Sequence, residues 1–155
     1  MILIAAACAA MLLLTASTHF ETLALLNAML PRLCMPRRLK VLVVLVAVFA
    51  AHVLEMALYA LAYRGFGGVA QVGSLSGGAS ASFAACLYFS AETFTSLGFG
   101  DVTPDGPLRL LAGMETLNGL LLVGWSASYI HLCMDRFWTD ESIPAGPPTA
   151  PSPPR

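Results

Sequence analysis

The chain has 155 residues, of which 57% are apolar and only 11% are charged. Because an average soluble domain carries roughly 25% charged residues, this composition excludes a water-soluble domain. The 8 Lys and Arg residues are nearly balanced by 9 Asp and Glu residues, which excludes a basic nucleic-acid-binding surface spread over the molecule. We therefore expect an integral membrane protein in contact with lipid, with neither a nucleic acid nor a soluble substrate as a partner.

In chain order, the first long apolar segment covers residues 1–30. We interpret it as an N-terminal transmembrane helix within residues 2–28. A cleaved signal peptide is the alternative, and the absence of positive charge before Arg32 argues against it. Residues 41–63 and 108–134 predict an outer and an inner helix, and the first of these would be about 34 Å long, enough for a bilayer core of about 30 Å.

A short basic loop separates the first two apolar segments. Residues 31–40 hold half of the positive charge of the chain, at Arg32, Arg37, Arg38 and Lys40. The positive-inside rule makes this loop cytoplasmic, so the N-terminus and the connection between the outer and inner helices should lie outside. Residues 139–155 are rich in proline and predict a disordered cytoplasmic tail.

The connection between the second and third spans does not fit a simple loop. Residues 64–80 are rich in glycine and serine and predict a flexible outer loop. Residues 81–95 are mostly apolar but too short to span a bilayer, which favours a re-entrant helix. Residues 96–101 follow, and there Gly98 and Gly100 alternate with bulky residues.

Alternating glycines suit a strand whose carbonyl oxygens all face one side. Glycine accepts a positive φ at no steric cost, and alternating such residues lets successive carbonyls point the same way. Four such strands around an axis would form stacked rings of oxygen that replace the hydration shell of a cation. Because the chain has one copy of this segment, such a ring requires four chains.

The stretch from Glu92 to Pro104, ETFTSLGFGDVTP, resembles the pore loop of potassium channels, whose common pattern is T-x-G-[YF]-G-D followed shortly by proline. The resemblance extends over residues 41–135. It implies an all-α membrane protein with a potassium-channel pore domain at residues 41–138, preceded by one N-terminal transmembrane helix.

The same resemblance implies a function and a location. The protein would be a homotetrameric channel for selective passive transport of K⁺, with no cofactor other than the transported ion. An enzyme is not expected, because the sequence shows no nucleophile–base set, phosphate loop or metal cluster. K⁺ would bind the filter at Ser96, Leu97, Gly98 and Phe99, with Gly100 completing the filter. Similarity to small prokaryotic channels implies the bacterial inner membrane.

Three filter residues depart from the family pattern. Ser96 stands where threonine is usual, Leu97 replaces valine or isoleucine, and Phe99 replaces tyrosine. Serine lacks the methyl group that restricts the threonine rotamer, so selectivity could be less strict. A weakly selective monovalent cation channel and a non-conducting membrane subunit are the alternative functions.

The resemblance also implies residues that support the filter. Matching positions place Glu92 of the pore helix behind the filter and next to Asp101 at its outer mouth, with Thr95 at the start of the filter. Two close carboxylates do not both ionise cheaply, so the pair should share a proton. The alternative is that Asp101 is a solvated charge and Glu92 is exposed near the interface.

Four further polar residues lie inside the predicted spans. His52 and Glu55 share one face of the outer helix, and Glu115 and Asn118 share one face of the inner helix. Because both glutamates lie at comparable depth, we expect a buried polar contact between the two helices, with separate local satisfaction as the alternative. A metal site at His52 and Glu55 is not favoured, because the sequence shows no third ligand.

The remaining features have ordinary explanations. His19 and His131 are interpreted as packing or interfacial residues. Gly119 lies nineteen residues after Gly100, where the family has a gating hinge, and close helix packing is the alternative for this glycine.

Overall fold

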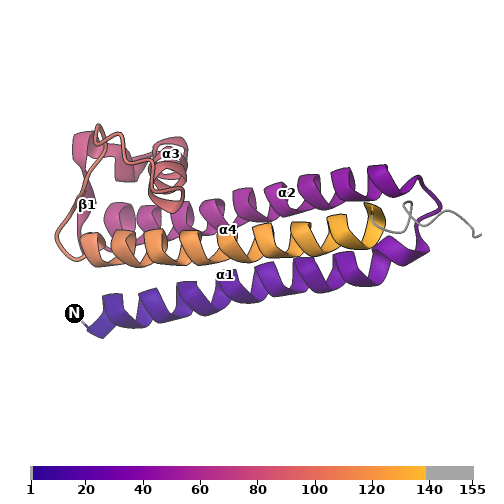
Figure 1. Ribbon diagram of the computed structural model, residues 1–155. Helices are drawn as coiled ribbons and strands as arrows, with labels where there is room; N and C mark the ends of the chain where they lie inside the picture. The colour runs from indigo at the N-terminus through magenta and orange to yellow at the C-terminus, as the bar shows by residue number, and fades with distance from the viewer. Residues whose placement is uncertain (1, 139–155) are drawn as a thin grey trace, which may run out of the picture.

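The computed structural model describes residues 2–138 and consists of three long helices with a small subdomain at one end (Figure 1). The long helices α1 (Ile2–Met29), α2 (Arg37–Tyr63) and α4 (Leu108–Trp138) lie side by side. All three are long and apolar enough to cross a membrane. The short helix α3 (Phe83–Phe94) sits against α2 and α4 at the end where α1 begins. This arrangement confirms the predicted all-α membrane fold.

Helix α1 packs along both α2 and α4, because residues suited to burial recur every three to four positions along it. That face is formed by the buried residues Ile4, Cys8, Thr15, His19, Leu23 and Leu26, a spacing that places all of them on one side of a helix. Large apolar residues such as Leu13, Phe20 and Leu25 are exposed on its other side. Two polar side chains of α1, Thr15 and His19, thus face protein rather than lipid.

The observed helix ends extend the predicted ones. Pro36 immediately precedes α2, and proline inside a helix clashes with the preceding turn, so the helix begins after it. The helix α2 then runs into a π-helical turn, η2 (Arg64–Val69). The inner helix α4 continues to Trp138, four residues beyond the predicted end at residue 134. The predicted disordered tail at residues 139–155 lies outside the described residues.

The predicted outer loop at residues 64–80 contains short regular elements, and its flexibility stays a prediction. The segment contains η2, a strand β1 (Ser74–Leu75) paired antiparallel with β2 (Pro104–Asp105), and a 3₁₀ helix η3 (Ser76–Ala81). Some of its glycines allow close packing: a Cβ at Gly73 would lie 2.7 Å from the Asp105 carbonyl oxygen, whereas a Cβ at Gly65 or Gly77 would meet nothing within 4 Å. A glycine-rich composition looks the same whether the glycines permit motion or close approach, so the sequence did not distinguish the two.

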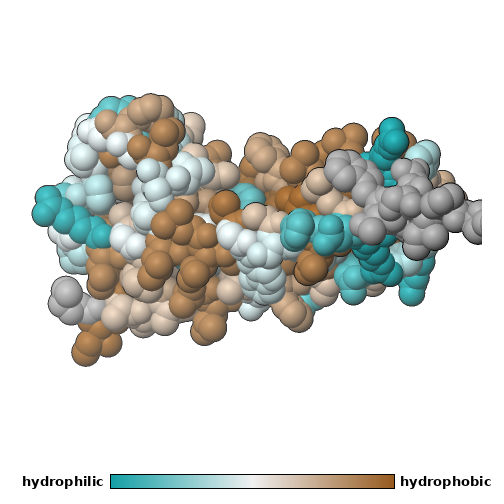
Figure 2. Space-filling view, in the orientation of Figure 1, coloured by the Kyte–Doolittle hydropathy of each residue, from teal (hydrophilic) through white to brown (hydrophobic). Residues whose placement is uncertain are grey.

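The surface agrees with a membrane environment. Figure 2 shows apolar residues along much of the flank of the three-helix bundle, with hydrophilic residues gathered near the connection between α1 and α2. That connection contains the 3₁₀ turn η1 (Leu30–Arg32) and is followed directly by Arg37, Arg38 and Lys40 in the first turn of α2, so the predicted 31–40 loop is shorter than expected. It lies at the end of the molecule opposite to α3 (Figure 1).

Candidate ion pathway and buried polar contacts

The backbone of residues 96–100 alternates between negative and positive φ. Ser96, Gly98 and Gly100 have φ values of 60°, 55° and 82°, whereas neither Leu97 nor Phe99 is among the residues with positive φ. A positive φ is uncommon for a residue with a side chain, so the conformation of Ser96 is held by its surroundings. The alternation expected from Gly98 and Gly100 is therefore present, and it extends back to Ser96.

Three consecutive backbone N–H groups of this segment turn toward Glu92. Leu97 N and Gly98 N donate to the Glu92 carbonyl oxygen at 2.8 and 3.2 Å, and Phe99 N donates to Glu92 Oε2 at 2.9 Å. In a planar trans peptide the carbonyl points opposite to the N–H. The carbonyl oxygens of Ser96, Leu97 and Gly98 therefore point away from Glu92 and carry no helical hydrogen bond.

The two carboxylates of the filter region have different partners. Glu92 is buried and accepts from Phe99 through Oε2, while its Oε1 has no partner among the described residues. Asp101 is exposed and accepts from the Tyr88 hydroxyl at 3.1 Å and from Val102 N at 3.0 Å. In place of the expected proton shared by Glu92 and Asp101, the structure has two separate contacts. Tyr88, which the sequence interpretation missed, contacts the outer-mouth carboxylate.

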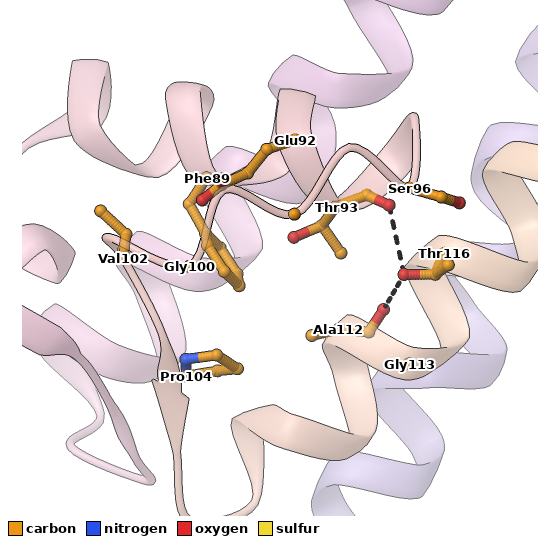
Figure 3. Close-up of a pocket in the computed structure, with 11 residues that line it drawn as sticks. Phe89, Glu92, Thr93, Ser96, Gly100, Val102, Pro104, Ala112, Gly113 and Thr116 are labelled. Atoms are coloured by element: carbon orange, nitrogen blue, oxygen red, sulfur yellow. Dashed lines mark hydrogen bonds between the residues drawn. The ribbon is translucent and has the colours of Figure 1, made fainter.

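The C-terminal end of α3 is fixed to the inner helix. The hydroxyl of Thr116 on α4 lies 3.2 Å from the Thr93 carbonyl oxygen and 3.1 Å from that of Ala112 (Figure 3). Thr95 caps α3 by donating its hydroxyl to the Ala91 carbonyl at 2.7 Å. The Thr95 side chain thus caps α3 immediately before the segment predicted to be the filter.

Gly119 lies where α4 crosses the end of α3. A Cβ at this position would collide with the Phe94 carbonyl oxygen and approach the Phe94 ring to 3.0 Å. Gly119 is therefore a close-packing residue in this structure, which is the alternative that the sequence left open. The hinge role of Gly119 stays a prediction.

A cavity of about 370 Å³ separates the filter from the inner helix. In Figure 3 the labelled residues Glu92, Gly100 and Val102 lie on one side of this space, and Ala112, Gly113 and Thr116 lie on the other. Leu97 and Phe99 are both largely exposed in the single chain.

Glu115 joins α4 to both α2 and α3. Its carboxyl oxygens lie 2.5 Å from the Tyr63 hydroxyl and 2.5 Å from Ser90 Oγ. Ser90 Oγ also lies 2.9 Å from the Met56 carbonyl oxygen. The Ser90 hydroxyl has only one hydrogen to donate, so it cannot donate to both acceptors. If the Glu115 carboxyl is protonated, it donates to Ser90 Oγ, and Ser90 donates its own hydrogen to the Met56 carbonyl. This arrangement pairs every group without placing a charge in the bundle.

Asn118 connects α4 to the N-terminal helix. Its side-chain nitrogen lies 2.7 Å from Thr15 Oγ1 on α1 and 3.2 Å from the Tyr59 hydroxyl on α2. All three groups lie in the interior of the bundle, and Asn118 retains only 2% of its surface exposure. A polar residue of the inner helix therefore holds the additional helix against the pore domain.

The expected buried polar contacts between α2 and α4 are present at Glu115 and Asn118, whereas Glu55 has other partners. Its carboxylate instead lies between two histidines, 2.9 Å from His19 Nδ1 and 2.8 Å from His52 Nδ1. His19 is completely buried, so its interpretation as an ordinary packing or interfacial residue is also corrected. The sequence missed His19 because the periodicity of one helix does not show which residue of another helix lies opposite it.

The same three side chains are the one described group whose donor atoms converge as metal ligands do, all within 4.8 Å of one another. His19 is the third candidate ligand, beside His52 and Glu55, that the sequence had not revealed. Zinc bonds of about 2.0–2.2 Å place neighbouring tetrahedral ligand atoms about 3.3–3.5 Å apart. The nitrogen–oxygen distances of 2.8 and 2.9 Å are instead those of hydrogen bonds to a charged group.

These features define a membrane protein with a re-entrant pore loop between two spanning helices. Residues 41–135 match the family model described as ion channel, and the chain belongs to this ion channel family. The match confirms the predicted membership of the pore-loop channels and indicates a transporter rather than an enzyme.

The chain is also similar to the inward rectifier potassium channel Kirbac3.1 of Paramagnetospirillum magnetotacticum, with 33% identity over 81 residues. The aligned part is 52% of this chain and 26% of that protein, so the chain spans about a quarter of the relative's length. No solved structure matches the chain significantly.

Proposed function

We propose that the protein conducts K⁺ selectively and passively through a pore formed by four identical chains. The observation that carries this proposal is the turn of three consecutive N–H groups, on Leu97, Gly98 and Phe99, toward Glu92. The carbonyl oxygens on the opposite side are free to replace the hydration shell of a cation. One strand offers one oxygen per layer, so four chains complete each ring, with no cofactor besides the transported ion.

The comparison with Kirbac3.1 supports potassium as the ion, because that relative is named a potassium channel. The similarity is confined to about a quarter of the relative, which supports a shared pore and leaves its regulation aside. The exposed Leu97 and Phe99 side chains and the cavity beside the filter support assembly, because a neighbouring chain can bury them.

The basic loop supports an orientation. Arg32, Arg37, Arg38 and Lys40 gather at the end of the bundle opposite α3. The positive-inside rule then places this loop and the end of α4 in the cytoplasm, and the N-terminus and filter outside. The bacterial inner membrane is the proposed location.

Relaxed selectivity is the second candidate, and two filter residues favour it. Ser96 has no β-methyl group and Leu97 has no β-branch, so both are less restricted at χ1 than threonine and valine. A filter held less rigidly would admit Na⁺ as well as K⁺. The third candidate, a non-conducting subunit, would bind a partner instead of forming its own pore.

Ion flux into liposomes that contain the purified protein tests the proposal. Flux under a K⁺ gradient is compared with flux under a Na⁺ gradient, for the wild type and the Gly98→Ala variant. A Cβ at Gly98 would meet nothing within 4 Å, but the φ of 55° is unfavourable for alanine. The variant therefore perturbs filter conformation without a steric collision inside the chain.

Gly124→Ala is the matched control, because Gly124 lies in α4 with nothing within 4 Å of a built Cβ and no positive φ. Flux with K⁺ alone that is lost in Gly98→Ala and kept in Gly124→Ala supports the proposed filter. Equal K⁺ and Na⁺ flux would favour the second candidate. Persistent flux in Gly98→Ala would overturn the pathway, and an absence of flux with a co-purifying partner would favour the third.

A further inference from the structure

A closed ring of hydrogen bonds joins three helices below the pore helix. His19 of α1 and His52 of α2 each direct Nδ1 at Glu55, at 2.9 and 2.8 Å. Their Nε2 atoms lie 3.1 and 3.0 Å from the single hydroxyl of Ser126 on α4. The two imidazoles stack between the carboxylate and the hydroxyl, with ring centroids 5.2 Å apart.

Counting hydrogens fixes the protonation of this ring. Its four contacts need one hydrogen each. Ser126 supplies one, two neutral imidazoles supply one each, and an ionised carboxylate supplies none. One contact therefore stays without a hydrogen unless the ring binds one additional proton, on an imidazole or on Glu55.

The net charge of the ring also indicates that it binds one additional proton. Glu55 is completely buried, and among residues 2–138 the ion-pair partners found for it are His19 and His52. Two aromatic side chains also lie beside the ring: Trp125 of α4 beside His19, and Phe94 of α3 beside His52. Without an additional proton the ring carries a buried negative charge, which is unfavourable in an apolar bundle. With one proton its net charge is zero.

A second additional proton is disfavoured in turn. Both Nε2 atoms would then donate to Ser126, and the ring would carry a buried positive charge. The Ser126 hydrogen would no longer have an acceptor within the ring. The state with one additional proton is thus the one in which every contact is paired and no net charge is buried.

We propose that His19, Glu55, His52 and Ser126 form a binding site for a single proton that couples α1 to the pore domain. While the proton is bound, α1, α2 and α4 are held together by a fully paired ring. Its release leaves a buried charge and an unpaired nitrogen, and loosens the contact between these helices. This proposal goes beyond ion conduction and does not depend on which cation the filter selects.

The position of the ring allows proton release to affect the proposed filter through packing contacts. The His52 ring lies 5.7 Å from the Phe94 ring, and Phe94 is the last residue of α3. The Phe94 carbonyl is also the group against which Gly119 of α4 packs. A shift of His52 therefore acts on the end of the pore helix, directly before the filter.

Glu55→Gln is the decisive variant, because its amide closes the ring without a titratable proton. The amide nitrogen can donate to one imidazole and the amide oxygen can accept from the other. Ser126, the two neutral imidazoles and the amide then supply all four hydrogens. The variant is a permanent mimic of the protonated ring and should fold. His131→Gln is the matched control, since His131 is an exposed histidine that faces Asp135.

Thermal and denaturant unfolding in detergent micelles should be compared between pH 6 and 9. In this range the unfolded wild type and the unfolded Glu55→Gln variant bind equal numbers of protons, because an unfolded glutamate is already ionised. The folded wild type binds one proton more than the folded variant. The wild-type unfolding constant, relative to that of Glu55→Gln, should therefore rise with pH, up to tenfold per pH unit.

The outcomes separate the proposal from its rivals. A relative stability that falls with pH, with His131→Gln like the wild type, supports the proton site. Equal pH profiles for the wild type and Glu55→Gln would overturn it. Stabilisation of the wild type by added Zn²⁺, lost in His19→Gln, would also overturn it in favour of a metal site.

Nitrogen-15 NMR of the histidines in the wild type decides the question even if Glu55→Gln does not fold. Without the additional proton, both rings are Nδ1–H tautomers with bare Nε2 atoms. With it, at least one of His19 and His52 carries a hydrogen on Nε2. Two bare Nε2 atoms at pH 7 would overturn the proposal. Cation flux that depends on pH in the wild type and not in Glu55→Gln establishes the coupling, and equal dependence in both overturns it.

Discussion

The backbone N–H of Phe99 donates a hydrogen bond to the carboxylate of Glu92, which lies seven residues earlier in the chain. The Glu92 carbonyl oxygen accepts the two preceding N–H groups of Leu97 and Gly98. A single residue of α3 thus orients three consecutive peptides of the proposed filter. The position of Glu92 on the last turns of α3 allows both its main chain and its side chain to reach them.

Replacing Glu92 should separate the need for an acceptor from the need for a charge. Glu92→Gln keeps an oxygen for the Phe99 N–H and should retain the wild-type ratio of K⁺ to Na⁺ permeability. Glu92→Ala leaves that N–H unpaired, which costs about 1–3 kcal/mol, and should lower the ratio. Reversal potentials under bi-ionic conditions measure this. A loss of selectivity in both variants alike would show that the charge is what matters.

A similar comparison applies to Glu115, which contacts Tyr63 and Ser90. Glu115→Gln can donate to Ser90 and accept from Tyr63, so its unfolding midpoint should stay close to that of the wild type. Glu115→Leu leaves the Tyr63 hydroxyl without an acceptor in the interior, at a cost of about 1–3 kcal/mol. Thermal unfolding in detergent measures the difference. A leucine variant as stable as the glutamine variant would contradict the role given to this contact.

Local features of the fold were readable from the sequence, and contacts between helices were not. The spans follow from apolar length, and the alternating sign of φ in residues 96–100 follows from the alternation of Gly98 and Gly100 with bulky residues. The partners of Glu55 depend on how α1 lies against α2, a relation that involves residues 36 positions apart. One signal was present: His19 and Thr15 fall in the same helical stripe as Ile4, Cys8 and Leu23.

The expected Glu92–Asp101 pair illustrates a second limit. The resemblance to potassium channels placed both carboxylates near residues 96–100, and in the structure Glu92 accepts a hydrogen bond from Phe99 N. It did not indicate their partners, because these depend on neighbouring side chains such as Tyr88. The outer segment between α2 and α3 shows the same limit, since its order comes from pairing with residues 104–105, far along the chain.

Gly119→Ala should weaken the contact between the inner helix and the pore helix. The added Cβ would collide with the backbone carbonyl of Phe94, and backbone cannot move aside as a flexible side chain can. We expect a lower unfolding midpoint and a lower K⁺ flux, although alanine is the better helix former by about 1 kcal/mol. Unfolding in detergent and liposome flux measure the two effects.

Gly113→Ala and Gly124→Ala are matched controls on the same helix, because a built Cβ at either position meets nothing within 4 Å in the chain. Each should be as stable as the wild type or more stable by up to about 1 kcal/mol. If Gly119→Ala behaved like these controls in stability but abolished flux, flexibility at Gly119 would be the explanation, as the hinge hypothesis predicts.

Cys34 offers a direct test of the proposed orientation, because it is the exposed cysteine among the four and lies in the basic loop. Cys8, Cys86 and Cys133 are buried, and burial raises the pKa of the Cys86 thiol, which lowers the fraction of reactive thiolate. A membrane-impermeant maleimide added to intact spheroplasts should therefore leave the wild type unlabelled, and permeabilised cells should show labelling at Cys34. Val69→Cys in a Cys34→Ser background places a thiol at the last residue of η2, beyond the other end of α2. Val69 is 81% exposed, and the introduced thiol should react without permeabilisation. Labelling of Cys34 in intact spheroplasts, with Val69→Cys protected, would reverse the orientation and place the filter on the cytoplasmic side.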